Sequence, residues 1–183
     1  KDLKTELVKM ETLFNKNIND ETTTFMFTKS ELDGLPETWF SSHDEVNGVY
    51  KVTLKYPDYI PIMKYCNIRN VRKKIYKAFN SRCLDKNIPL LAEIIKTRSI
   101  LSTKLGYETY ADYSTEVKAV KTAKTAIDFE NRLNKMFTPL YEKERNELLV
   151  FAKNAGFSGE KIRQWDTGYY SRLYKEELYD MNM

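Results

Sequence analysis

Histidine is nearly absent from this sequence, which has one, His43, among 183 residues. Catalytic zinc sites take three protein ligands, commonly including histidine, and hydrolytic triads place a histidine beside a nucleophile. His43 lies in the polar stretch 41–45 with no nucleophile at a recognisable spacing, so we expect an exposed loop histidine rather than a catalytic one. The sequence therefore predicts no catalytic, cofactor-binding or metal-ligating residue in this chain.

Cysteine is scarce too, and long apolar runs are missing. Two cysteines in a chain of this length favour reduced, buried thiols at Cys66 and Cys83, with a disulfide between them as the alternative. No apolar run approaches the roughly 18 residues of a membrane helix, and we expect no signal sequence before Lys1. We expect a soluble chain whose first helix had a further portion upstream.

Glycine and proline are few, at 6 and 5 residues, while 42% of residues are hydrophobic and 31% charged. This composition is typical of a helical globule and excludes a disordered chain. The net charge of +4 arises from interspersed signs, as on a solvated helical surface. Carboxylates such as Glu142, Glu144 and Glu147 alternate with lysine and arginine, which indicates surface ion pairs rather than catalytic acids.

Helical periodicity dominates the apolar pattern and predicts a mainly α fold, a helical array with one small β-hairpin near residues 44–56. Residues 50–56 alternate with a period of two after Asn47-Gly48, a strong turn signal, and the triplet 25–27 is expected to be buried. A short helix is expected from a capping box at Ser30 to Phe40. Longer helices are predicted over 3–18, 59–66, 71–83, 91–105, 122–154 and from 159 or 166 toward 178.

The length fits one domain or a piece of a larger fold, since one core usually serves about 100 to 200 residues. We expect a single helical segment over 1–183, with a helix at 1–18 and a loop, short helix and hairpin at 19–57. A helical layer follows at 58–121, in which the three helices between 59 and 105 pack as antiparallel neighbours, and long helices occupy 122–183.

Two surface features leave alternatives open. The basic run 69–74 has tyrosines nearby and permits nucleic-acid binding through phosphates and stacking. Apolar residues at 71, 75 and 79 instead favour the outer face of an amphipathic helix, and we expect no nucleic-acid partner. The 13 tyrosines permit peptide recognition, but core side chains with one solvated end are the commoner role.

Five stretches in a fixed order carry a resemblance to a known family. They are TFMFTKSELDGLP at 24–36, VTLKYPDY at 52–59, AFNSRC at 78–83, LGYETYADY at 105–113 and IRQWDTGYY at 162–170. Together they resemble the family of thimet oligopeptidase, neurolysin and saccharolysin, zinc metallopeptidases that cut short peptides. The collinear matches extend from about residue 15 to 179.

The resemblance implies a much longer, two-lobed helical enzyme with a deep channel. Its chemistry rests on His-Glu-x-x-His in one helix plus a glutamate from a following helix. This sequence contains no such motif, so the family's zinc ligands and general base have no counterpart here.

The resemblance thus predicts a segment of a zinc-dependent oligopeptidase that contributes scaffold and channel wall without the metal site. The alternative is a stand-alone, non-catalytic helical module that binds peptides or a protein. The expected partners are short peptides and the remainder of the peptidase fold, with no membrane. Zinc is expected in the parent enzyme only, and the location is expected to be cytoplasmic or, alternatively, mitochondrial.

Overall fold

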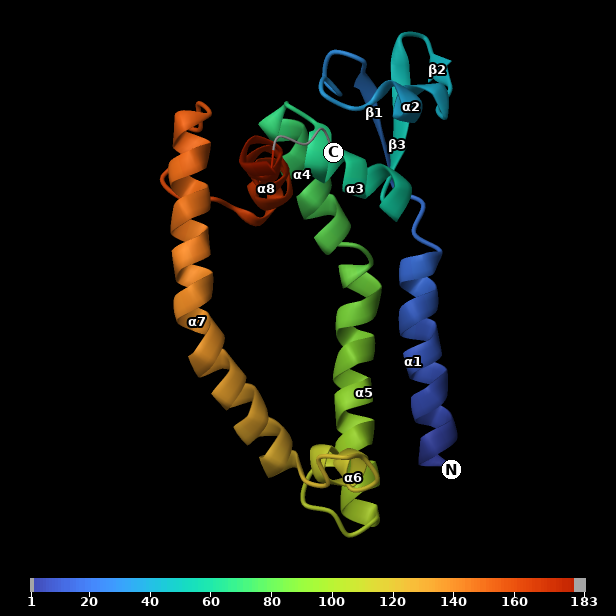
Figure 1. Ribbon diagram of the computed structural model, residues 1–183. Helices are drawn as coiled ribbons and strands as arrows, with labels where there is room; N and C mark the ends of the chain where they lie inside the picture. The colour runs from blue at the N-terminus through green and yellow to red at the C-terminus, as the bar shows by residue number, and fades with distance from the viewer. Residues whose placement is uncertain (1, 180–183) are drawn as a thin grey trace. The chain divides into compact units, whose positions relative to one another are not determined.

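A computed structural model describes residues 2–179 and divides them into two compact units. The first unit comprises residues 2–21 and 83–141, and the second comprises 22–82 and 142–179. Among the described residues, no helix is both long and apolar enough to cross a membrane. The elements are mainly helices with one small sheet, as the sequence predicts (Figure 1).

In the first unit, α1 (Leu3–Asn19) packs against α5 (Leu84–Lys104), and the short α6 (Tyr110–Thr115) lies beside α5 (Figure 1). The Asp2 side chain caps α1 by accepting a hydrogen bond from the Lys4 N–H at 3.1 Å. Leu7, Ile94 and Leu101 form the buried core. The buried face of α5 meets α1, a pairing that the sequence did not predict.

A buried amide fixes the junction between α1 and α5. The Asn87 side chain accepts a hydrogen bond from Asn17 Nδ2 at 2.8 Å and donates one to the Phe14 carbonyl at 3.1 Å. Helix α5 therefore begins seven residues earlier than its apolar pattern indicates, since polar bonds as well as apolar contacts hold its first turns.

Helix α7 (Ala123–Asn154) runs unbroken through Pro139 and confirms the predicted long helix. Its first part, to Tyr141, belongs to the first unit and its second part to the second unit. The first part leaves Met136, Phe137 and Leu140 at least half exposed. Gly156 follows the helix with a φ of 89°, as expected of a helix stop.

The second unit contains an antiparallel sheet of three strands in the order β1-β3-β2. β2 (Glu45–Val46) and β3 (Val49–Thr53) form the predicted hairpin, whose turn residues Asn47 and Gly48 have positive φ. β1 (Thr24–Thr28) pairs with β3 and was not predicted. The expectation that residues 25–27 are all buried is wrong, because strand alternation leaves Met26 50% exposed while Phe27 is buried.

Four helices complete the second unit: α2 (Glu37–Ser41), α3 (Tyr56–Tyr65), α4 (Arg69–Asn80) and α8 (Gln164–Tyr179). The strand expected to reach residue 56 ends at Thr53, because α3 begins at Tyr56 with Pro57 in its first turn. The helix expected from Ser30 begins only at Glu37, after a run of turns.

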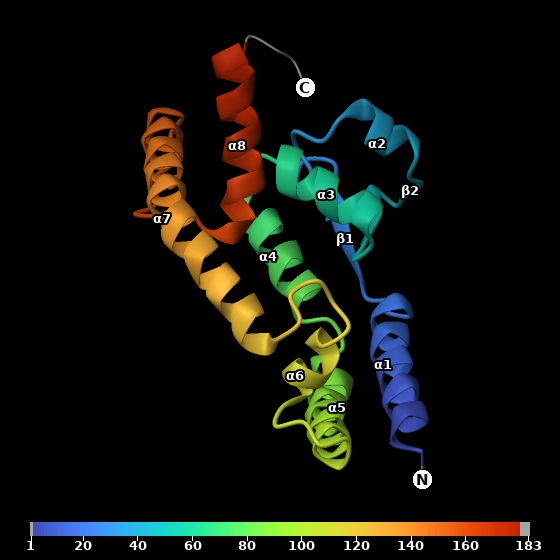
Figure 2. The same ribbon diagram turned by 60° about the horizontal axis from the view of Figure 1, so that its bottom comes forward.

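Helix α8 lies against α3 and α4, which Figure 2 shows from a second side. A Cβ at Gly168 would lie 3.1 Å from the Met63 carbonyl oxygen, so a glycine permits this close approach of α8 to α3. Val52, Ile62 and Ile75 form the centre of the buried core between sheet and helices.

Candidate functional site

The side chains most able to bind metal or act as nucleophiles are dispersed. Within residues 2–179, no group of three or more His, Cys, Asp and Glu residues is placed to hold a metal ion. Cys66 and Cys83 are both buried free thiols, and the alternative of a disulfide between them is wrong. Burial raises the pKa of the Cys66 thiol, which therefore stays protonated and unreactive at neutral pH.

His43 is not the exposed loop histidine expected from the sequence, because both ring nitrogens are engaged. Nε2 lies 2.8 Å from Asp58 Oδ1, and Nδ1 lies 2.7 Å from the Trp39 carbonyl. Asp58 Oδ2 accepts two hydrogen bonds, from the Thr53 backbone N–H at 2.7 Å and from the Thr53 hydroxyl at 2.5 Å. The Ser42 hydroxyl lies 3.0 Å from His43 Nδ1 but donates its hydrogen bond to the Trp39 carbonyl, so it is not activated as a nucleophile. The cluster joins α2, β3 and α3.

A buried ion-pair cluster fixes α8 against α4. Asp166 is fully buried and accepts from Arg69 Nε at 2.8 Å and Nη2 at 2.7 Å, in the paired geometry of a guanidinium and a carboxylate. Arg72, 1% exposed, adds a bond to Asp166 at 3.3 Å and donates to the carbonyls of Cys66 and Trp165. The hydrogen bond to Asp166 raises the pKa of Arg69.

This cluster corrects the interpretation of the basic run 69–74 as an outer helix face. Lys73 and Lys74 are exposed and lie over aromatic rings, but Arg72 is buried and Arg69 is paired. Sequence reasoning missed the role of Asp166, although it singled out the Trp-Asp stretch in which this residue lies. The other available signal for a buried ion pair was the i, i+3 spacing of Arg69 and Arg72 on a helix with an apolar stripe.

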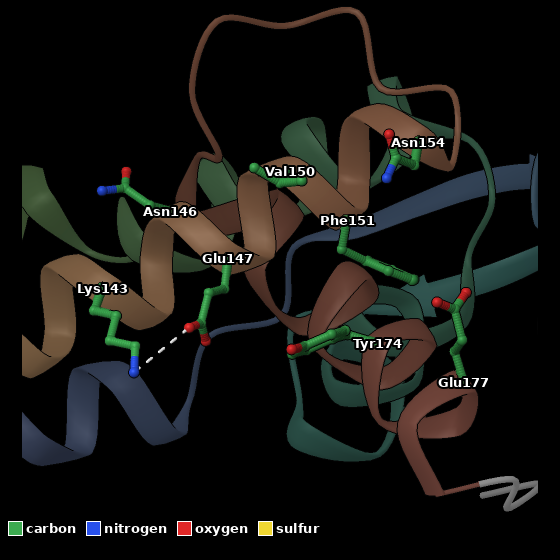
Figure 3. A pocket seen from close by; sticks show the side chains of 8 residues that line it. All are labelled: Lys143, Asn146, Glu147, Val150, Phe151, Asn154, Tyr174 and Glu177. Carbon is green, nitrogen blue, oxygen red and sulfur yellow. Dashed lines mark ion pairs between the residues drawn. The ribbon is translucent and has the colours of Figure 1, made fainter.

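A groove lies between the second part of α7 and α8, both within the second unit (Figure 3). Its volume is about 700 Å³, within the range of ligand pockets. The rings of Phe151 and Tyr174, with centroids 5.2 Å apart, and the side chain of Val150 supply its apolar surface. Beneath it, Leu148, Ala152 and Tyr170 belong to the buried cluster that holds the two helices together.

Polar side chains border the groove at both ends. Figure 3 shows Lys143 and Asn146 toward one end and Asn154 and Glu177 at the other. Lys143 forms an ion pair of 3.9 Å with Glu147, which also lines the groove. Asn146, Asn154 and Glu177 have no side-chain partner among the residues that the structure describes, so their polar groups are available to a ligand.

Comparison with known proteins gives consistent results. Residues 62–183 match the family described as Peptidase family M3. The chain is 32% identical to oligopeptidase A of Salmonella typhimurium and 33% identical to a thimet-like oligopeptidase of Dictyostelium discoideum, over 99% and 93% of its length. It is 31% identical to saccharolysin of Saccharomyces cerevisiae over 93% of its length. The chain spans 29%, 26% and 25% of these three relatives.

Proposed function

The chain belongs to peptidase family M3, and from this membership we propose that it is a segment of a zinc-dependent oligopeptidase, a metalloendopeptidase that hydrolyses short peptides. The observation that carries the proposal is the family match over residues 62–183, the greater part of the chain. Two of the three relatives are named oligopeptidases, and these names support peptides as the substrate class.

The residues of this chain do not fit a catalytic zinc ion. Three protein ligands are needed, and neutral imidazole is the commonest nitrogen ligand. The one histidine has both ring nitrogens within hydrogen-bond distance of Asp58 and of the Trp39 carbonyl, which leaves neither free for a metal. We infer that the zinc ligands and the general base lie outside these residues, and no hydrolytic step passes through the side chains described here.

The segment itself is proposed to be scaffold and channel wall. A channel wall must be rigid while peptides pass, and buried polar contacts make the second unit rigid. The buried bonds of Asp166 fix α8 on α4, and the His43 cluster joins the sheet to α3. The groove between α7 and α8 is the part of this wall best suited to contact a peptide.

Zinc content and peptide hydrolysis measured on this chain test the proposal. We expect less than stoichiometric zinc after purification with zinc present, and no cleavage of a fluorogenic peptide. Oligopeptidase A of Salmonella typhimurium, assayed in parallel, serves as the positive control. Turnover by this chain that depends on one bound zinc would refute the assignment of the metal site to residues elsewhere.

A stand-alone binding module is the second candidate, and the groove with its unpartnered amides is the observation that favours it. Such a module would bind a peptide or protein without hydrolysis. The reading frame beyond Met183 distinguishes the two candidates: a continuation that encodes His-Glu-x-x-His supports the enzyme, and a stop codon supports the module. The location stays a prediction: we expect the protein in the cytoplasm or, alternatively, in mitochondria, and cell fractionation tests this.

A further inference from the structure

The groove between α7 and α8 combines an apolar centre with polar groups at fixed spacing. Val150, 61% exposed, lies between the two ends of the groove, next to the paired rings of Phe151 and Tyr174. Exposed apolar surface of this kind favours contact with an apolar ligand group. One aliphatic or aromatic side chain of a ligand is therefore expected over Val150.

Two side-chain amides define the length of the ligand. Asn146 and Asn154 lie eight residues apart on α7, which corresponds to about 12 Å along a helix axis. An extended peptide advances about 3.3 Å per residue, so about four of its residues cover this distance. Each amide offers both a donor and an acceptor, which is the complement of a peptide group. The spacing therefore matches two backbone contacts, one at each end of a tetrapeptide.

Charge gives the ligand a direction. Lys143 is compensated by Glu147 at 3.9 Å, whereas Glu177, at the same end of the groove as Asn154, has no cationic partner among the described residues. The groove therefore carries one uncompensated negative charge at the Asn154 end. A ligand ammonium or guanidinium placed there gains a charge-assisted hydrogen bond.

We propose that this groove is a binding site for an extended peptide segment of about four residues, with a cationic group at Glu177, an apolar side chain on Val150, and backbone contacts to Asn146 and Asn154. The inference rests on the proposed function, because it assigns the peptide contact of the wall to a particular surface. It adds a preference for peptides with a positive charge at the end that lies near Glu177.

Titration of the ¹⁵N-labelled chain by NMR tests the site. The probe is the tetrapeptide lysyl-leucyl-alanyl-alaninamide, and its uncharged counterpart is acetyl-norleucyl-leucyl-alanyl-alaninamide. We expect saturable shifts confined to residues 143–154 and 174–177, with a Kd for the cationic peptide about fivefold lower than for the uncharged one. Glu177→Gln is expected to bring the two Kd values within about twofold of each other.

Further variants separate the contacts. Asn154→Ala is expected to raise the Kd of both peptides by about fivefold, because it removes a neutral hydrogen bond whatever the charge of the ligand. Glu144→Gln, an exposed carboxylate on α7 outside the groove, is the matched control and should leave both Kd values unchanged. All three positions are exposed, so the variants should fold as the parent chain does.

Three results would overturn the site: no saturable binding of either peptide, shifts centred outside the groove, or equal effects of Glu177→Gln and Glu144→Gln. Occupation of the groove by a second copy of the chain would also overturn it. This result would appear as a dimer that Val150→Asp dissociates, together with no binding of either peptide. None of these results bears on the family or on the zinc and hydrolysis test, so the two proposals fail separately.

Discussion

Arg69 and Asp166 lie 97 residues apart in the chain and meet through two parallel hydrogen bonds of 2.8 and 2.7 Å. The carboxylate is fully buried, and the nearly fully buried Arg72 depends on the same group for its charge compensation. The Asp166 carboxylate at the start of α8 therefore binds two arginines of α4.

Replacement of this carboxylate should destabilise the second unit. Asp166→Asn removes the negative charge and leaves Arg72 buried without a counter-ion, a change that typically costs roughly 3–5 kcal/mol. The free energy of unfolding in urea measures the effect. Asp128→Asn, which breaks the exposed pair with Lys124, is the control and should change stability by less than about 1 kcal/mol. A loss for Asp166→Asn no larger than that of the control would contradict the role of the buried pair.

Gly34 should tolerate no side chain. Its φ is +92°, and a Cβ would lie 2.3 Å from the Tyr65 carbonyl oxygen and 2.8 Å from Asn67 Cγ. Gly106 has a similar φ of +85° with nothing within 4 Å of the added atom. Gly106→Ala should therefore cost only the backbone strain, about 1–2 kcal/mol, and Gly34→Ala clearly more. Thermal unfolding of the two variants compares them, and equal melting temperatures would be the contrary result.

Alkaline pH should weaken the fold in part through Cys66. Burial raises the pKa of this thiol above its ordinary value of about 8.5, so the folded chain retains the proton to a higher pH than the unfolded chain. The associated stability is present below the ordinary pKa and is lost as the pH rises through the folded-state pKa. Urea unfolding at pH 7.5 and 9.5 should show a larger loss for the parent chain than for Cys66→Ala. Equal losses would mean that this thiol does not contribute.

The exposed apolar face of α5 should promote self-association. Leu84, Ile88, Leu91 and Ile95 are each more than 40% exposed and recur at intervals of four, three and four residues, the spacing of a helix-packing stripe. We expect sedimentation velocity to show oligomers of the parent chain and mostly monomer for Ile88→Gln combined with Ile95→Gln. Lys96→Gln, an exposed neighbour outside the stripe, is the control. Oligomers that persist in the double variant would place the contact elsewhere.

Local pattern was sufficient for two long helices of this fold, α1 and α7. The stripe over residues 3–18 predicted α1, and the stripe over 122–154 predicted α7. Asn47-Gly48 located the hairpin, because this pair strongly favours a turn with two positive φ values. β1 escaped prediction because its three central residues, Phe25, Met26 and Phe27, are all apolar, so the sequence shows no period of two there.

The site could not be read from local pattern, because its parts meet only through tertiary packing. Asp166 and Arg69 belong to distant segments of the sequence. The apolar stripe of α4 predicted that Arg72 faces solvent, whereas Arg72 is buried. The groove depends on how α7 and α8 lie side by side, and the exposed amides that border it resemble ordinary surface residues in the sequence.

The position of the lone imidazole has a practical consequence for all of these experiments. Its two carbon-bound ring protons give one proton signal each, because no other histidine contributes to that spectral region. The ring stacks on the Trp39 indole at a centroid distance of 3.8 Å, which displaces those signals through ring currents. The chain thus contains its own spectroscopic reporter for the junction of α2 with α3, and melting of that junction can be followed without any added label.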